Sequence, residues 1–164
     1  MSAGAEQVTN FTNAVLLDLP SPGCCVFLCE WNSKASIYPW SEPETPAQRR
    51  SQLRAVLSDR GGGPLGLVGL HAIHLGTPSL ERHLRQWQAL SGSRTHPIQL
   101  TAEIALELYP AKHLQIDALS FAVRSLDVAR HFLASQNLLR DDHGGMLTVV
   151  CESLQIRLVK HTPV

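Results

Sequence analysis

The hydrophobic pattern of residues 68–90 changes its period halfway along. In the first half, side chains of alternating character predict a β-strand with two different faces. One face carries Ile73, Leu75 and Thr77, and the other carries Ala72, His74 and Gly76. In the second half, apolar residues recur every three or four positions, which predicts an amphipathic helix. The apolar stripe of this helix consists of Leu80, Leu84, Trp87 and then Ala89 or Leu90. Thr77 is placed to cap the helix, Pro78 suits its first position, and Gly92 suits its end.

The same order of strand, capping residue and helix is repeated at residues 116–139. Alternating apolar positions predict the strand, Ser125 is placed to cap, and a second apolar stripe predicts the helix. The strand positions are Leu119, Phe121 and Val123, and the stripe is Leu126, Ala129, Phe132 and Leu133. Further strands are predicted at residues 97–101, 103–109, 146–151 and 154–160, with a turn at 141–145. The chain therefore reads β-α-β-β twice, which predicts the α+β class.

Residues 1–64 precede these two units and differ from them. Two strands are predicted at residues 11–19 and 24–31, around a Pro- and Gly-containing connection at 20–23. A helix is predicted at 47–59, with its arginines, Arg54 among them, on a solvated face. Its buried side would carry Leu53, Val56 and Leu57. A Gly-rich run at 61–64 marks the boundary. We expect three parts: an N-terminal segment at 1–64, and two modules at 65–112 and 113–164.

Composition excludes several classes of function. The 164 residues carry 14 basic and 14 acidic side chains, so charge does not favour nucleic acid or an acidic membrane surface as a partner. No apolar run is long enough to span a bilayer, and residues 1–10 lack the layout of a signal peptide. The cysteines are expected to be buried reduced thiols of a cytoplasmic protein. They are Cys24, Cys25, Cys29 and Cys151.

This pattern resembles the vicinal oxygen chelate superfamily, which includes glyoxalase I, extradiol dioxygenases and bleomycin-resistance proteins. The resemblance is clearest over residues 66–90, 103–110 and 116–159, and the stretch LVGLHAIHLGTPSLE after VFLCEW is similar to its glyoxalase-like branch. The resemblance implies repeated βαβββ modules whose curved mixed sheets surround a shared cavity. It also implies that residues 11–31 are the remnant hairpin of a preceding module.

In metal-using members of the superfamily, four side chains from the first and last strands of the two modules hold one divalent ion. The matching positions in this chain are Ala72, Glu107, Ala118 and Arg157. Two alanines cannot ligate a metal, and arginine is a permanent cation. We therefore expect no metal, with Arg157 in the place of the ion and paired with Glu107. The alternative is that Arg157 reaches solvent and never meets Glu107.

His74 keeps a metal alternative open, because it lies two residues beyond Ala72 and hence on the same face. His74 and Glu107 would be its protein ligands for Zn, Mn or Fe. His71 is expected to face the helices and to be structural. No phosphate-binding loop and no G-x-S-x-G motif occurs in the sequence.

Three functions follow as hypotheses. The first is a glyoxalase-like protein without metal that binds a small organic ligand through His74, Tyr109, Ser120 and Arg157, with Glu107 as the residue for any catalysis. The second is a metal-dependent glyoxalase-like lyase, isomerase or dioxygenase in which Glu107 moves a proton. The third is a non-catalytic module that forms a homodimer through an unpaired sheet edge near residues 24–31.

Overall fold

The computed structural model describes residues 11–15, 27–31, 46–152 and 154–162. Its first elements are β1 (Phe11–Val15), β2 (Phe27–Trp31), α1 (Pro46–Asp59) and the short 3-10 helix η1 (Gly63–Leu65). The first module then contains β3 (Leu67–Thr77), α2 (Leu80–Ser91), β4 (Ile98–Gln99) and β5 (Ala105–Pro110). The second contains β6 (Gln115–Val123), α3 (Leu126–Ser135), β7 (Asp141–His143), β8 (Met146–Cys151) and β9 (Leu154–Lys160).

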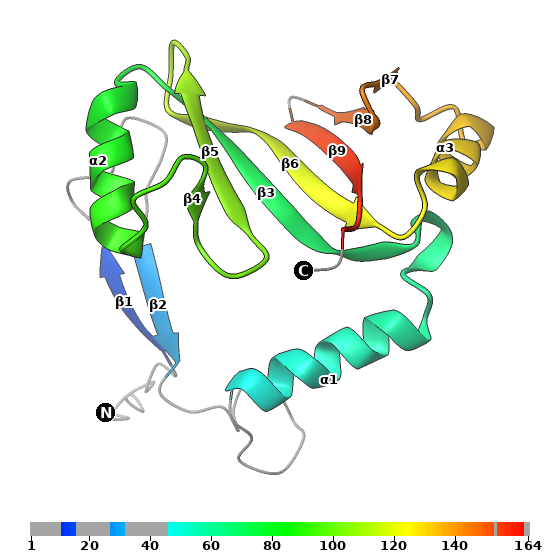
Figure 1. Cartoon of the computed structure of the whole chain (residues 1–164), viewed down its shortest axis with the longest axis horizontal. Helices are drawn as coiled ribbons and strands as arrows, with labels where there is room; N and C mark the ends of the chain where they lie inside the picture. Colours follow the sequence, from blue (N-terminus) through cyan, green and yellow to red (C-terminus); the bar gives the residue numbers. More distant parts are fainter. Residues whose placement is uncertain (1–10, 16–26, 32–45, 153, 163–164) are drawn as a thin grey trace, which may run out of the picture.

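The two modules share one curved, unclosed sheet of seven strands in the order β4-β5-β3-β6-β9-β8-β7. The first strands of the modules, β3 and β6, pair antiparallel at the centre. Each also pairs in parallel with the last strand of its own module, β3 with β5 and β6 with β9. α2 and α3 lie toward opposite ends of this sheet, and among the described residues α1 and the β1–β2 pair neither belong to it nor cover its apolar face (Figure 1). The predicted α+β class with repeated strand–helix modules is confirmed.

Alternation along the strands gives the sheet one apolar face. Two buried clusters form on this face, one beneath each helix. The first contains Leu75, Ile98, Leu106, Leu108 and Leu114, packed against Leu80, Leu84 and Trp87. The second contains Val123, Ala129, Leu133, Leu147 and Leu158. The predicted helix stripes therefore pack where the period placed them, except at the end of α2, where Ala89 and Leu90 are both exposed.

The predicted start of α2 is wrong by two residues. Thr77 is the last residue of β3, and the helix begins at Leu80 after Ser79. Thr77 Oγ1 instead accepts a hydrogen bond from the Ser79 backbone N–H at 3.1 Å. Since Thr77 still pairs in the sheet, its side chain caps the turn that leads into the helix rather than the helix itself. In α3 the prediction is confirmed, because Ser125 Oγ accepts from the Val128 N–H at 3.3 Å.

Three other predictions are wrong. Residues 141–143 form strand β7 rather than a turn, because their backbone pairs with the edge of β8. Charged side chains suit this position, since they point into solvent at the sheet edge. Val56 is 48% exposed, so it does not pack on a buried side of α1. Cys151 is exposed at the end of β8.

Some predictions lie outside the described residues. They concern residues 16–19 and 24–26 of the two leading strands, the connection at 20–23, and the side chains of Cys24, Cys25, Cys29, Leu53 and Leu57. Within the described part of the chain, no helix combines the length and apolar character needed to cross a membrane.

Candidate functional site

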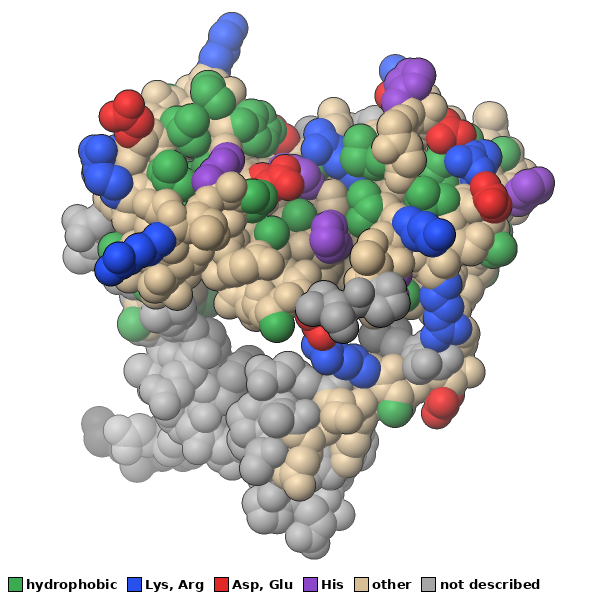
Figure 2. Space-filling view, viewed as in Figure 1, with side chains coloured by type: hydrophobic (Ala, Val, Ile, Leu, Met, Phe, Trp, Pro, Cys, Tyr) green, Lys and Arg blue, Asp and Glu red, His purple; other side chains and the backbone are tan. Residues whose placement is uncertain are grey.

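The second face of the sheet has a floor of small side chains along its two central strands. Strand register places Ala72, Gly76, Ala118, Ser120 and Ala122 on this face, as the sequence predicted. The same register adds Glu107 and Tyr109 from β5 and Arg157 from β9. Small side chains leave room above them, and Figure 2 shows histidine and acidic side chains gathered over the middle of the sheet.

Ser120 and Glu107 are joined through His74 of β3 into a continuous hydrogen-bonded chain across three strands of this face. His74 Nε2 lies 2.6 Å from Ser120 Oγ, and His74 Nδ1 lies 2.9 Å from Glu107 Oε2. An ionised carboxylate only accepts hydrogen bonds, so Nδ1 carries the proton and donates to Glu107. A neutral imidazole then has its lone pair on Nε2, which accepts from the Ser120 hydroxyl. The direction of the chain is therefore Ser120 to His74 to Glu107.

Burial decides the protonation state of His74. The residue is 6% exposed, and the loss of solvent lowers its pKa below the ordinary value of 6.5. The negative charge of Glu107 and its hydrogen bond oppose this shift, while the positive charge of Arg157 and nearby His71 add to it. The net direction is downward. His74 is thus neutral at pH 7 and available as a proton acceptor.

The predicted ion pair between Arg157 and Glu107 is not formed in the part of the chain that the structure describes. Arg157 Nη1 lies 3.4 Å from His74 Nδ1, and Nη2 donates to Gln155 Oε1 at 3.1 Å. The physical reason is strand order, since β3 and β6 separate β5 from β9. His74, on β3, occupies the space between the two charges. Because its Nδ1 proton points at Glu107, His74 is the group that pairs with the carboxylate.

Tyr109 belongs to a separate cluster at the other end of this face. Its hydroxyl donates to Asp117 Oδ2, and the Gln115 side chain donates to the other oxygen of the same carboxylate. Burial, together with the hydrogen bond to Asp117, raises the pKa of Tyr109 to about 12. The tyrosine is therefore a neutral donor whose proton is already engaged. Its role as a ligand contact stays a prediction.

The metal site of the superfamily does not fit this face. Ala72 and Ala118 are buried and offer no donor atom, and Arg157 places a cation at the fourth position. Among the described residues, no group of three or more His, Cys, Asp or Glu side chains gathers as a metal site. His74 and Glu107, the alternative pair, are two donors that already bind each other. A stable zinc site needs at least three protein ligands.

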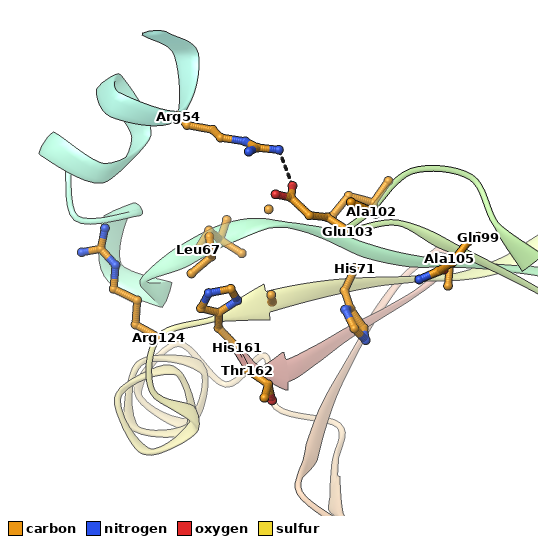
Figure 3. Close-up of a pocket in the computed structure, with 14 residues that line it drawn as sticks. Arg54, Leu67, His71, Gln99, Ala102, Glu103, Ala105, Arg124, His161 and Thr162 are labelled. Carbon is orange, nitrogen blue, oxygen red and sulfur yellow. Dashed lines mark hydrogen bonds and ion pairs between the residues drawn. The ribbon is translucent and has the colours of Figure 1, made fainter. Parts of the chain in front are cut away.

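A cavity of about 420 Å³ opens next to the hydrogen-bonded chain. It lies between α1, the start of β3, the segment joining β4 to β5, and the end of β9 (Figure 3). Its polar lining consists of Arg54, His71, Gln99, Glu103, Arg124, His161 and Thr162. Its apolar and glycine lining consists of Leu67, Val68, Gly69, Leu70, Ala102, Ala105 and Ala122. The predicted ligand contacts His74, Tyr109, Ser120 and Arg157 are not among these residues, and neither is Glu107.

The cavity corrects the prediction for His71 and gives Arg54 a partner that the sequence did not indicate. His71 was expected to be structural on the helix side, but it is exposed and lines the cavity. The β3–β6 register shifts between Leu70 and Ala72, which breaks strict alternation at this point. Arg54 is exposed, as expected for a solvated face, and its guanidinium also forms an ion pair with Glu103 across the mouth of the cavity (Figure 3). No local sequence pattern predicts this ion pair, because Arg54 and Glu103 are 49 positions apart in the sequence.

The cavity and the hydrogen-bonded chain are neighbours on the same face. Ala105 and Ala122 line the cavity, and each lies two residues along its strand from Glu107 and Ser120 respectively. Two residues of a strand span about 6–7 Å. A ligand that fills the cavity and extends over Ala72 therefore reaches the hydrogen-bonded side chains of Ser120 and Glu107.

Comparisons with known proteins give limited similarity. No protein-family model matches this sequence, and no curated protein matches it. One similar solved structure is methylmalonyl-CoA epimerase from Mycobacterium tuberculosis, with 14% sequence identity and a TM-score of 0.49. The superposition covers 62% of this chain and 92% of the epimerase chain. Membership of the vicinal oxygen chelate superfamily stays a prediction, and the site rests on its own geometry.

Proposed function

We propose that this chain is a glyoxalase-like binding protein that holds a small organic anion, without a metal ion, in the cavity between α1 and the sheet. The observation that carries the proposal is the charge of the cavity lining. The lining contains two guanidinium groups, Arg54 and Arg124, two imidazoles, His71 and His161, and a single carboxylate, Glu103. Guanidinium groups bind carboxylates and phosphates through charge-assisted hydrogen bonds.

The rest of the lining defines the other end of the ligand. Leu67, Val68 and Leu70 offer apolar surface, and Ala102 and Ala105 leave volume free. A volume of about 420 Å³ falls within the range of small-molecule sites. The proposed ligand therefore has a compact apolar body and one anionic group.

Two substitutions at the mouth of the cavity should change anion affinity in opposite directions. The probe is 1-anilinonaphthalene-8-sulfonate, an apolar anion whose fluorescence reports binding. Arg54→Met removes a cation and should weaken binding about 10- to 100-fold, the loss of one charge-assisted hydrogen bond. Glu103→Gln removes the acid that pairs with Arg54 and should strengthen binding by about threefold or more.

The matched control is Arg85→Met on α2, an exposed arginine that is paired only loosely with Glu81 at 3.9 Å. This variant should bind the probe like the parent protein. N-phenyl-1-naphthylamine, a neutral relative of the probe, should be insensitive to all three changes. Equal effects of Arg54→Met on both probes, or no binding of either one, would contradict the proposal.

The absence of a metal is a separate part of the proposal and has its own measurement. Protein purified without chelator or His-tag, then loaded with Zn, Mn or Fe(II) and desalted, should contain well below one metal per chain by elemental analysis. The reason is that only one of the four positions matching the superfamily's ligands, Glu107, carries a donor for a cation. About one metal per chain would contradict this part, and would favour a metal-dependent lyase or dioxygenase with His74 and Glu107 as ligands.

A further inference from the structure

We propose that Ser120 is a nucleophile, activated by His74 and Glu107, that cleaves a carboxylic ester held in the neighbouring cavity. This inference rests on the proposed function for its substrate, because the cavity supplies the binding site. It adds a reaction to that site. The groups involved come from three different strands, so no sequence motif contains them.

The first support is the geometry of the hydrogen-bonded chain. A serine nucleophile needs a base within about 2.6–3.2 Å, and the base needs a third group that orients it. Ser120 Oγ and His74 Nε2 are 2.6 Å apart, and His74 Nδ1 and Glu107 Oε2 are 2.9 Å apart. Such an arrangement is recognised by its geometry and by the roles of its members, and not by their order in the sequence.

The second support is the direction in which the hydrogen bonds are donated. Glu107 receives the Nδ1 proton, which leaves Nε2 free to accept the proton of Ser120. The side chain of Glu107 is 43% exposed, whereas His74 is buried beneath it. Burial lowers the pKa of His74, so its imidazole is in the neutral form that a general base requires.

The third support is the position of Arg157. It is the register partner of Ser120 on the neighbouring strand, and its guanidinium reaches His74 on the far side of that serine. Ser120 itself is 3% exposed. A substrate entering from the cavity side, past Ala105 and Ala122, would meet Ser120 across the His74 ring from the Arg157 guanidinium, which lies 3.4 Å from Nδ1. The positive charge favours the negative oxygen that develops during attack on a carbonyl through its field, without a contact to it.

The proposed reaction has two balanced steps. Ser120 Oγ forms a bond to the ester carbonyl carbon and gives its proton to His74 Nε2, and the ester bond then breaks as the alcohol leaves with that proton. Water next attacks the acyl-serine, gives one proton to His74, and releases the carboxylic acid as the proton returns to Ser120. The overall reaction consumes one ester and one water and yields one acid and one alcohol.

A small ethyl fluorophosphonate probe tests the nucleophile directly. Intact mass spectrometry of the folded chain should show one adduct, and peptide mapping should place it on Ser120. Ser120→Ala should abolish the adduct, and His74→Gln should slow its formation by about 10²-fold or more because the base is lost. Ser135→Ala, at an exposed serine that ends α3, is the matched control and should label at the parental rate.

The pH dependence of labelling distinguishes a base from a merely structural histidine. Charged or titratable groups facing His74 are Glu107 from β5, Arg157 from β9 and His71 from β3. The rate should rise with pH and level off, with a midpoint below 6.5. Glu107→Gln should move this midpoint lower still, because the carboxylate raises the pKa of His74. A rate that follows no ionisation in this range would contradict the inference.

Other outcomes separate this inference from the proposed function. Binding of the naphthalenesulfonate probe without any Ser120 adduct would overturn the nucleophile and leave the binding proposal intact. An adduct that persists in Ser120→Ala would also overturn the nucleophile. A Ser120 adduct without probe binding would support the nucleophile and contradict the anion site. Unchanged circular dichroism of Ser120→Ala would show that its loss of labelling does not come from unfolding.

Discussion

Replacing Leu158 by alanine should lower the free energy of unfolding by about 2–5 kcal/mol, the usual cost of removing a large side chain from a packed core. Leu158 is 1% exposed in β9, and it packs in the cluster beneath α3 with Val123, Leu133 and Leu147. The substitution removes apolar contacts and leaves a cavity that strand β9, held between β6 and β8, cannot close. Urea unfolding followed by circular dichroism measures the change.

Leu138→Ala provides the matched control, because Leu138 is 51% exposed just after α3. The same chemical change at that position should alter the free energy of unfolding by about 0.5 kcal/mol or less. Similar effects of the two substitutions would show that the cluster beneath α3 does not form as described.

Gly76→Ala should destabilise the protein by about 1–3 kcal/mol. The reason is that the second face of the sheet, which carries His74 and Ser120, has no room for a methyl group at this position. A Cβ atom at Gly76 would lie 2.5 Å from Asp117 Oδ2 and 2.8 Å from Ala111 Cβ. Neither neighbour moves freely. Tyr109 and Gln115 hold the Asp117 carboxylate, and the Ala111 N–H donates to the Thr77 carbonyl at 2.8 Å. Thermal and urea unfolding both report the loss.

Gly69→Ala in the same strand is the control, because a Cβ atom there would meet nothing within 4 Å. Removing glycine from a strand reduces the entropy lost on folding, so this variant should be neutral or slightly more stable. A Gly76→Ala protein as stable as Gly69→Ala would mean that Asp117 does not sit against β3, and it would remove the Tyr109 cluster from this face.

Which side chains lie on the second face of the sheet, where the candidate site is, was predictable from residue order alone. A strand alternates its side chains strictly, so Ala72, His74 and Gly76 had to share one face, and Ala118, Ser120 and Ala122 likewise. Pairing of β3 with β6 then brought the two sets together. The β3–β6 register shifts at three places, and near one of them, at His71, the prediction of a structural histidine was wrong.

The contacts between these residues were not predictable in the same way. The sequence indicated Arg157 as the partner of Glu107, since their charges are opposite and both lie on last strands. The structure pairs Glu107 with His74 instead, because β3 lies next to β5 whereas β9 is two strands further away. Charge alone does not decide a pair when a hydrogen-bonding side chain stands between the two ions.

Local pattern therefore determined the strands, the two helix stripes, the repeated module and the side chains of each face, because all of these depend on periods of a few residues. Only the tertiary structure decided the Ser120–His74–Glu107 chain and the cavity beneath α1. Both depend on distances between strands and helices far apart in sequence, such as Arg54 and Glu103. Such distances arise from sheet order and helix packing, which no short-range period encodes.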